Sequence, residues 1–319
     1  MAEPPPPPCP ITGEPAAELL QSIPAKLLYD LWRRGARVEP APLRRDQGRV
    51  NLWRSPCGLA FFDPALPGSP GFYAALYGRV RAHETMAGEA ATRGDFRAGA
   101  ALARPGDAVL DVGCGHGAFA GLLPAGIRYQ GLEPHGAPPP GSPPISAETV
   151  AAHAARCPGA YDLACAFQVL EHVADPLGMA AAMARCLKPG GRLVLAMPIW
   201  PSPHTDFPNN LVNLPPHHLS WWDAGACRAL AAALGLEVEQ VGPLATYPSQ
   251  ASLHWALRLT PFRTAPGAWV KPYWRWHLAG AAALWLGTKA ARWFGLPRGA
   301  RPLDILLVAR KPPPSVPAA

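Results

Sequence analysis

The chain has 319 residues, which is enough for one large domain or for one domain with additions. Hydrophobic residues make up 49% of it and charged residues 16%, so the chain can bury a sizeable core. Seven scattered cysteines without paired spacing exclude a disulfide framework, and reduced thiols suit a cytoplasmic protein. The formal net charge is +7, and its distribution along the chain is uneven. The segment from Arg258 to Lys311 contains ten Lys and Arg residues and a single acid, Asp304.

The N-terminus and the most apolar segment both argue against membrane insertion. Residues 1–15 have neither a basic start nor an apolar run, so no secretory signal is expected. They are rich in proline, and we expect disordered tails at 1–15 and at 312–319. The apolar core of 276–296 is about half the ~20 residues that a membrane-spanning helix needs.

Residues 16–80 are expected to form a small N-terminal module. Residues 16–36 carry apolar side chains at helical spacing, interrupted by Pro24. Two short strand-like runs follow around Ser55–Gly58. Residues 71–103 then resemble two helices broken near Gly94.

From Asp107 onward, short apolar runs alternate with helical patterns. Pro189, Gly190 and Gly191 are expected to end one of these helices, at 175–191. Such alternation predicts an α/β fold with a doubly wound, mostly parallel sheet that helices cover on both faces. The β-branched run at 301–311 adds a last strand and brings the sheet to seven. The expected strands before it are 107–113, 127–134, 143–146, 160–170, 192–198 and 236–242, and the other helices are 116–124, 147–157 and 223–235.

Residues 243–301 interrupt the alternation and are expected to form a helical insertion before the last strand. The segment is rich in tryptophan and arginine. A basic segment can meet nucleic acid, an anionic lipid surface or an acidic substrate, or it can be a solvated face. We expect a lid or a peripheral membrane or protein contact through 243–301. The alternative for its tryptophans is core packing of an added helical layer.

A glycine-rich turn follows the first strand of the alternation. Gly113, Gly115 and Gly117 are spaced by one residue each, and Asp111 precedes them. A nicotinamide dinucleotide site needs a different glycine spacing, and an acid beside the turn suits a sulfonium or ammonium better than a pyrophosphate. Glu133 ends the next strand, where a carboxylate can accept both ribose hydroxyls. These residues together predict a nucleoside-binding site.

The segments VLDVGCGHG, GLEP, YDLACAFQVLEHVADP and LKPGGRLVLAMP together resemble the class I S-adenosylmethionine-dependent methyltransferases of the small-molecule type. The resemblance implies a Rossmann-like core at 81–242 plus 302–311, with S-adenosylmethionine as cofactor. It implies that the glycine loop passes under the methionine part, that Glu133 holds the ribose, and that the ends of the third and fourth strands border the adenine and the reactive methyl. The implied cofactor-binding residues are Asp111, Gly113, Cys114, Gly115, Glu133, Ser146, Ala147, Phe167 and Gln168.

Histidines supply the candidates for a general base. His217 and His218 lie in NLPPHHLSWWD, after the fifth strand and over the carboxyl end of the sheet. Methyltransferases resembling this one often carry a histidine in this loop, so the resemblance favours His218 first and His217 second as catalytic residues. The alternative is a structural loop whose imidazoles bond to the backbone. Glu171 and His172 resemble a Glu-His pair of the family or cap the next helix, and His204 is a weaker base candidate.

The segments CPITG and RSPCGLAFFDP resemble a small zinc-binding module that precedes some of these methyltransferases. The positions of its four thiolates are occupied here by Cys9, Thr12, Arg54 and Cys57. Two thiolates do not hold a structural zinc. We therefore predict a degenerate zinc-ribbon-like module without metal.

The sequence predicts a methyltransferase that acts on an oxygen, nitrogen or carbon atom of a sugar, polyketide-like or lipid-linked acceptor. The transfer is an in-line displacement, which depends on alignment and is assisted by a histidine base. The alternative is a non-catalytic cofactor-binding protein that retains the fold. A nucleic-acid partner is disfavoured, because the sequence has no Asn/Asp-Pro-Pro-Tyr-type motif and no recognised RNA-binding module.

Overall fold

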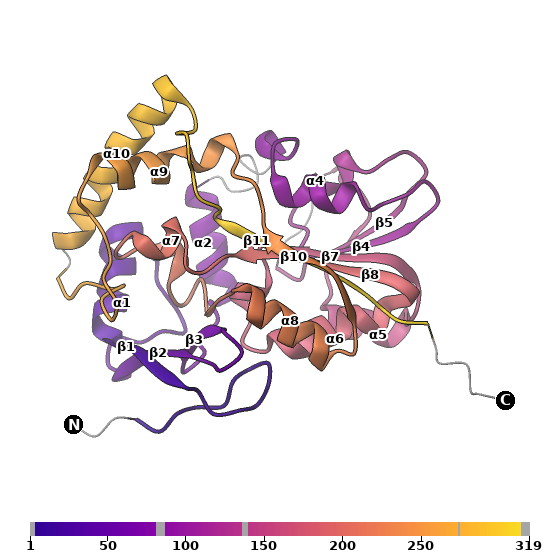
Figure 1. Cartoon of the computed structure of the whole chain (residues 1–319), viewed down its shortest axis with the longest axis horizontal. Coiled ribbons are helices and arrows are strands. Elements are labelled where there is room, and N and C mark those ends of the chain that lie inside the picture. The colour runs from indigo at the N-terminus through magenta and orange to yellow at the C-terminus, as the bar shows by residue number, and fades with distance from the viewer. Residues whose placement is uncertain (1–3, 81–86, 136–139, 274, 314–319) are drawn as a thin grey trace.

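The computed structural model describes residues 4–80, 87–135, 140–273 and 275–313. Its centre is a seven-stranded sheet in the order β10-β11-β8-β7-β4-β5-β6 (Figure 1). Neighbouring strands from β6 to β8 are parallel, whereas β11 is antiparallel to both β8 and β10. The predicted α/β fold with a mostly parallel seven-stranded sheet is confirmed. The strands are β4 (Ala108–Val112), β5 (Arg128–Leu132), β6 (Ile145–Ser146), β7 (Tyr161–Phe167), β8 (Leu187–Pro198), β10 (Glu237–Pro243) and β11 (Asp304–Arg310).

Helices cover both faces of this sheet, because successive strand residues point to opposite faces and most of them are apolar. Leu193 and Leu195 pack with helices α5 (Val150–Arg156), α6 (Pro176–Cys186) and α8 (Ala224–Ala233). Val194 packs on the other face with Phe96 of α4 (Gly94–Ala100) and Phe119 of the short 3₁₀ turn η2 (Ala118–Leu122). Figure 1 shows the first three helices together on one side and α4 on the other.

A second, four-stranded sheet has the order β1-β2-β3-β9. Its first three strands are β1 (Glu18–Pro24), β2 (Arg49–Arg54) and β3 (Ala60–Asp63), and the helices α1 (Ala25–Leu31) and α2 (Pro70–Val80) belong to the same part of the chain. The fourth strand, β9 (Ser220–Trp221), comes from the segment that follows His217 and His218. The small sheet is therefore completed by a loop of the large one.

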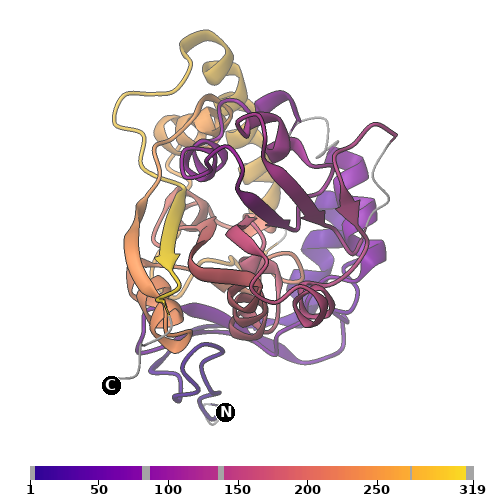
Figure 2. The ribbon, with the colours of Figure 1, turned by 90° about the vertical axis from the view of Figure 1, so that its right-hand side faces the viewer.

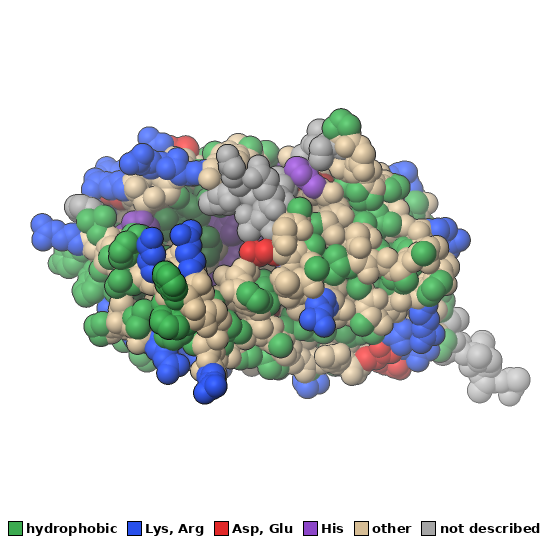
Figure 3. Space-filling model, turned by 90° about the horizontal axis from the view of Figure 1, so that it is seen from above, with side chains coloured by type: hydrophobic (Ala, Val, Ile, Leu, Met, Phe, Trp, Pro, Cys, Tyr) green, Lys and Arg blue, Asp and Glu red, His purple; other side chains and the backbone are tan. Residues whose placement is uncertain are grey.

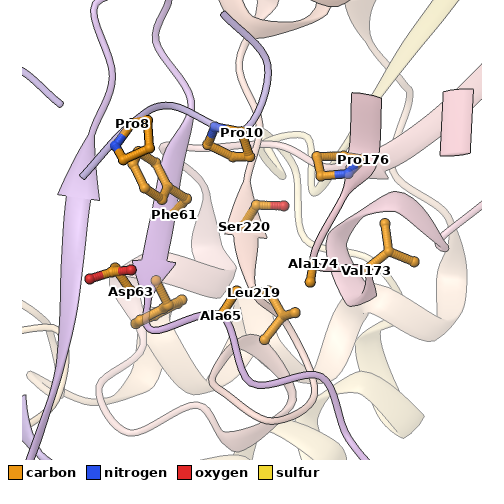
Figure 4. A pocket seen from close by; sticks show the side chains of 11 residues that line it. Pro8, Pro10, Phe61, Asp63, Ala65, Val173, Ala174, Pro176, Leu219 and Ser220 are labelled. Atoms are coloured by element: carbon orange, nitrogen blue, oxygen red, sulfur yellow. The ribbon is translucent and has the colours of Figure 1, made fainter. Parts of the chain in front are cut away.

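A pocket of about 170 Å³ lies where the N-terminal part meets the large sheet's loops. Figure 4 shows Pro8, Pro10 and Phe61 on one side of it, and Val173 and Leu219 on the other.

The helical insertion is a pair of packed helices, α9 (Ala251–Leu259) and α10 (Arg275–Phe294). Gly287 of α10 lies so close to α9 that a Cβ there would clash with the carbonyl oxygen of Ser252. Figures 1 and 2 show the insertion and the small sheet on opposite sides of the large sheet. Within the described residues, no helix is both long and apolar enough to cross a bilayer. The remaining short helices are η1 (Trp32–Ala36), η3 (Leu170–His172), α7 (Pro203–Asp206), η4 (Leu211–Asn213) and η5 (Pro248–Gln250).

Three local expectations differ from the structure. Residues 18–24 form strand β1 rather than a helix, because their backbone pairs antiparallel with β2. The helix expected at 175–191 ends at Cys186, and Pro189 to Gly191 lie within β8. The expected tail at 1–15 includes Cys9 and Ile11, which are buried, so apolar contacts order this segment. Residues 314–319 of the other expected tail lie outside the described residues.

Candidate functional site

The glycine loop after β4 has a backbone that favours glycine. Gly113, Gly115 and Gly117 all have positive φ, at 72°, 54° and 79°. A Cβ on Gly113 would lie 2.6 Å from the Val169 side chain, and a Cβ on Gly117 would lie 2.5 Å from Pro143. Side chains larger than hydrogen are therefore excluded for both conformational and packing reasons at these positions. The loop backbone is thus packed closely against Val169 and Pro143.

Glu133 lies directly across this loop, as the sequence predicted. Its carboxylate accepts hydrogen bonds from the backbone N–H groups of Gly115 and His135, both at 3.1 Å. Its own N–H donates to the carbonyl oxygen of Ser146 at 3.0 Å, so the end of β6 is adjacent. The structure thus brings Glu133, the loop and Ser146 together at the carboxyl edge of the sheet.

Asp111 and Cys114 face inward from the loop. Asp111 is buried and accepts a hydrogen bond from the Tyr129 hydroxyl at 2.8 Å. Burial raises the pKa of Asp111 to about 7. Cys114 is also buried, and a Cβ on Gly131 would lie 2.6 Å from its Sγ. Both side chains therefore support the loop from beneath.

The other predicted cofactor residues differ in how they face the site. Ala147 is exposed beside Ser146. Phe167 does not point its ring at the edge of the sheet, because the ring is packed between Phe96 and Phe119. Gln168 has a φ of 60°, and its side-chain amide donates to Asp304 at 3.2 Å. Phe167 is therefore placed to border a ligand through its backbone.

Three histidines from two segments meet beyond the end of β7. The ring centroids of His172 and His217 are 4.5 Å apart, those of His172 and His218 are 4.8 Å apart, and those of His217 and His218 are 4.6 Å apart. His172 belongs to η3, and the other two precede β9. We call these three residues the histidine cluster.

Hydrogen bonds fix the tautomers of the histidine cluster. Nδ1 of His172 bonds to the carbonyl oxygen of His217 at 2.7 Å, and Nδ1 of His217 bonds to the carbonyl oxygen of Val212 at 2.6 Å. Nδ1 of His218 bonds to Oδ1 of Asn213 at 3.0 Å. Because these oxygens only accept, each Nδ1 carries the proton and each Nε2 has a free lone pair. The sequence alternative of backbone-bonded imidazoles is thus met on one side of the His172 and His217 rings, and His218 bonds to the Asn213 side chain instead.

Burial keeps these histidines neutral, and a buried carboxyl group without hydrogen-bond partners among the described residues lies beside them. Desolvation lowers the pKa of His172 to about 4 and the pKa values of His217 and His218 well below the usual histidine range. Glu171 is 0% exposed, and burial raises its pKa well above the usual range. Its Oε1 lies 3.8 Å from Nε2 of His172 and 3.9 Å from Nε2 of His218. Neither carboxyl oxygen has a hydrogen-bond partner among the described residues.

Helix α2 connects the two halves of the site. The ring of Tyr73 stacks on His135 with centroids 6.4 Å apart and meets His172 edge-on at 5.9 Å. Tyr77 contacts His217 at 6.1 Å. Neither tyrosine was predicted as a site residue, although their spacing of four residues places them on one helical face. His204, the weaker base candidate, instead bonds to Asn210.

The zinc-module positions do not converge as four ligands. The Sγ atoms of Cys9 and Cys57 are 3.9 Å apart, whereas Thr12 and Arg54 are exposed. Across the described part of the chain, the only group of three or more potential metal ligands is the histidine cluster. The absence of metal from the N-terminal module stays a prediction.

Residues 83–241 match the family model described as a methyltransferase domain. The chain contains a class I S-adenosylmethionine-dependent methyltransferase domain. Its cofactor is S-adenosylmethionine, as predicted. The glycine loop and Glu133 fit this group, because the loop lies at the carboxyl edge of the sheet and Glu133 offers carboxylate oxygens beside it.

Similarity to named proteins is partial. The methyltransferase domain is 39% identical over 99 residues to the ubiquinone biosynthesis O-methyltransferase of Pectobacterium carotovorum, covering 28% of this chain and 41% of that protein. It is 34% identical over 119 residues to an uncharacterised 37.1 kDa protein of Streptomyces fradiae, covering 34% of each. The matched part thus spans about two-fifths or less of these relatives' length.

Two solved structures are also similar. An S-adenosylmethionine-dependent methyltransferase from Archaeoglobus fulgidus has a TM-score of 0.49 and 15% identity, covering 75% of this chain and 100% of that one. The 1,6-didemethyltoxoflavin-N1-methyltransferase of Burkholderia thailandensis has a TM-score of 0.48 and 18% identity, covering 82% of this chain and 96% of that one.

Proposed function

We propose that this methyltransferase modifies an oxygen, nitrogen or carbon atom of a small-molecule acceptor that is a sugar, a polyketide-like compound or a lipid-linked intermediate. The observation that carries the proposal is the histidine cluster, a group of neutral imidazoles connected through Tyr73 to the Glu133 side of the site. The name of the Pectobacterium relative favours oxygen as the acceptor atom.

On the cofactor side, Gly113 to Gly115 and Glu133 are the residues we expect to hold S-adenosylmethionine. The cofactor supplies an electrophilic methyl group when bound. The loop backbone would lie against the methionine part, and Glu133 would accept the ribose hydroxyls in place of its present N–H donors. Ser146 and Ala147 would border the adenine, and the backbone of Phe167 and Gln168 would flank the methionine.

On the acceptor side, we propose that Nε2 of His218 or of His217 accepts the proton that the acceptor loses. Both Nε2 atoms have free lone pairs, because both Nδ1 atoms are bonded to oxygen. Oε1 of Glu171 lies 3.9 Å from Nε2 of His218, where a carboxylate would stabilise the imidazolium that forms. Tyr73 would help to exclude water from this side, since its ring covers His172 and His217.

The first test is calorimetric titration of the full chain with S-adenosylmethionine and with S-adenosylhomocysteine. Glu133→Ala is expected to weaken both affinities by about 10- to 100-fold, because it removes charge-assisted hydrogen bonds worth roughly 1.5–3 kcal/mol. Glu239→Ala, whose carboxylate pairs with Arg192 away from the loop, is the matched control. If the folded wild-type chain binds neither ligand, the proposal is wrong.

A second test separates catalysis from cofactor binding. Phenolic, sugar and lipid-linked acceptors are screened for methyl transfer with the wild type, His218→Ala and His204→Ala. Transfer that is lost in His218→Ala and kept in His204→Ala supports the acceptor site. Cofactor binding without transfer to any acceptor would favour the non-catalytic alternative.

A further inference from the structure

We propose that His172, His217 and His218, together with Glu171, bind one divalent transition-metal ion of the Zn²⁺ or Fe²⁺ type. The inference concerns the acceptor side of the proposed function, but metal binding itself does not depend on methyl transfer. Imidazole nitrogens with one carboxylate are a donor set that these ions favour.

The first argument is proximity. One ring nitrogen of each histidine lies within 4.8 Å of those of the other two. Oε1 of Glu171 is 3.8 Å and 3.9 Å from two of the Nε2 atoms. Ligand atoms on one tetrahedral Zn²⁺ are about 3.3 Å apart, given metal–ligand distances of about 2.0–2.2 Å. Side-chain rotations that move these atoms by about an ångström would therefore bring them to one ion.

The second argument is the hydrogen bonding behind the rings. In metal sites, a ligating histidine almost always donates its other ring N–H to a carbonyl or carboxylate, which orients the free nitrogen. Every member of the histidine cluster has its Nδ1 bonded to an oxygen atom. Each Nε2 therefore has a lone pair to offer a metal, as a ligating imidazole requires.

The third argument is independent of the rings. Glu171 is fully buried, and both its carboxyl oxygens lack hydrogen-bond partners in the described structure. A buried carboxyl group without partners is costly, and bound metal is one of the few ways to compensate it. A cation between Glu171 and the histidine cluster would satisfy the carboxylate and the three lone pairs at once.

Such an ion would change how the acceptor is activated. A hydroxyl oxygen bound to a metal loses its proton at a lower pH than a free hydroxyl. With the ion bound, the histidines hold it and the proton leaves to solvent; in the metal-free chain, Nε2 of His218 or of His217 accepts the proton as proposed above. The site would favour acceptors whose reacting atom is oxygen.

The test uses the full chain, treated with a chelator and then titrated with Zn²⁺ by calorimetry and with Co²⁺ by visible absorption, without cofactor or acceptor. The double variant Cys9→Ser/Cys57→Ser serves as the background, because those two thiols are a separate place where Zn²⁺ could bind. We expect one equivalent of metal in this background. His218→Ala should abolish it, and Glu171→Gln should weaken it about 10-fold or more. His153→Ala, whose ring bonds to Glu148 and Tyr161 away from the cluster, should leave it unchanged.

Absence of metal binding in the folded background protein would overturn the proposal, as would binding that His218→Ala leaves intact. If His218→Ala fails to fold, as judged by circular dichroism, His172→Gln replaces it. Methyl transfer that proceeds in chelated protein would leave the proposed function standing without the metal. Metal binding without any cofactor binding would support the metal site and refute the proposed function.

A second inference stands on a separate observation: we infer that α10 docks on an anionic membrane surface. The residues of α10 that face α9 and its neighbours are small, namely Gly280, Ala283, Gly287 and Ala290. The large apolar side chains point outward instead, with exposures of 61% at Trp285, 84% at Trp293 and 71% at Phe294. This is the inverse of the usual amphipathic helix of a soluble domain.

The positive charge of this part of the chain favours an anionic partner for this face. Residues 240–303 contain eight Lys and Arg residues and no Asp or Glu. Lys289 lies over the Trp285 ring at 5.6 Å, so a basic group accompanies the exposed aromatic side chain. Figure 3 shows blue basic and green hydrophobic side chains next to one another on the left of the view. Aromatic rings with Lys and Arg beside them are typical of helices that lie in the interface of an anionic bilayer.

Vesicle sedimentation tests this inference. The full chain is mixed with vesicles of phosphatidylcholine alone and with vesicles that also contain phosphatidylglycerol. We expect binding to the anionic vesicles, weakened by added salt and lost in Trp285→Ala/Trp293→Ala. Trp269→Ala, whose ring packs against Trp221, should keep it. No binding to anionic vesicles would overturn the inference. A concentration-dependent dimer that the double variant abolishes would assign this face to a second copy of the chain instead.

Discussion

Replacing Gly113 by alanine tests whether the cofactor loop depends on its backbone conformation and on close packing. Gly113 has a φ of 72°, and a Cβ there would lie 2.6 Å from Cγ2 of Val169. The left-handed conformation costs an alanine roughly 1–2 kcal/mol, and forcing a methyl group into packed side chains costs about 1–3 kcal/mol more. Gly13 has the same φ with no heavy atom within 4 Å of its Cβ position, so Gly13→Ala incurs only the first cost.

The assay is urea denaturation of both variants and the wild type, followed by calorimetric titration with S-adenosylmethionine. The free energy of unfolding is expected to fall by about 2–5 kcal/mol in Gly113→Ala and by about 1–2 kcal/mol in Gly13→Ala. Cofactor affinity should fall only in Gly113→Ala, because only that loop must move away from Val169. Equal losses of stability, or an unchanged affinity in Gly113→Ala, would refute the reasoning.

Three further predictions concern buried polar groups. Burial raises the pKa of Asp111 from 3.8 to about 7 in the folded chain. The free energy of unfolding should therefore fall as pH rises between these two values, because the unfolded chain releases the proton first. In denaturation at pH 4 and at pH 8, Asp111→Asn should reduce the difference between the two pH values by up to about 4 kcal/mol. Arg93→Met leaves its buried partner Asp95 unpaired and should cost about 3–5 kcal/mol, and adding Asp95→Leu should restore part of it in the same assay. Tyr73→Phe removes a buried hydroxyl that has no hydrogen-bond partner among the described residues, so the melting temperature should not fall. The acceptor KM should rise, because the Tyr73 ring contacts His172 and His217.

The small N-terminal sheet has a consequence for the acceptor side. Strand β9 pairs with β3 immediately after the histidine pair, and Nε1 of Trp32 donates to the carbonyl oxygen of Pro215 just before it. His217 and His218 are thus held between two attachments to the N-terminal part. Substitutions in that part, far from the histidines in sequence, are therefore expected to affect the acceptor side before the cofactor side.

Local patterns were sufficient where neighbours in sequence decide the conformation. The glycine spacing and the position of Glu133 after the next strand predicted a nucleoside-binding site, and the structure brings the Glu133 carboxylate to 3.1 Å from the Gly115 nitrogen. They were insufficient for residues 18–24, whose apolar side chains suit a helix as well as a strand. Pairing with β2, more than twenty residues later, decides that they form β1.

The sequence by itself determined the α/β alternation, the cofactor loop and its carboxylate, because these depend on periodicity and on turn chemistry over short distances. Only the tertiary structure decided how His172, Glu171 and the pair at 217–218 meet, since 45 residues separate them along the chain. Only the tertiary structure likewise decided which face of α10 is buried, since the helix contains both large and small apolar residues. Packing against α9 buried the small ones, because only their backbones allow such close approach, and left the tryptophans outside.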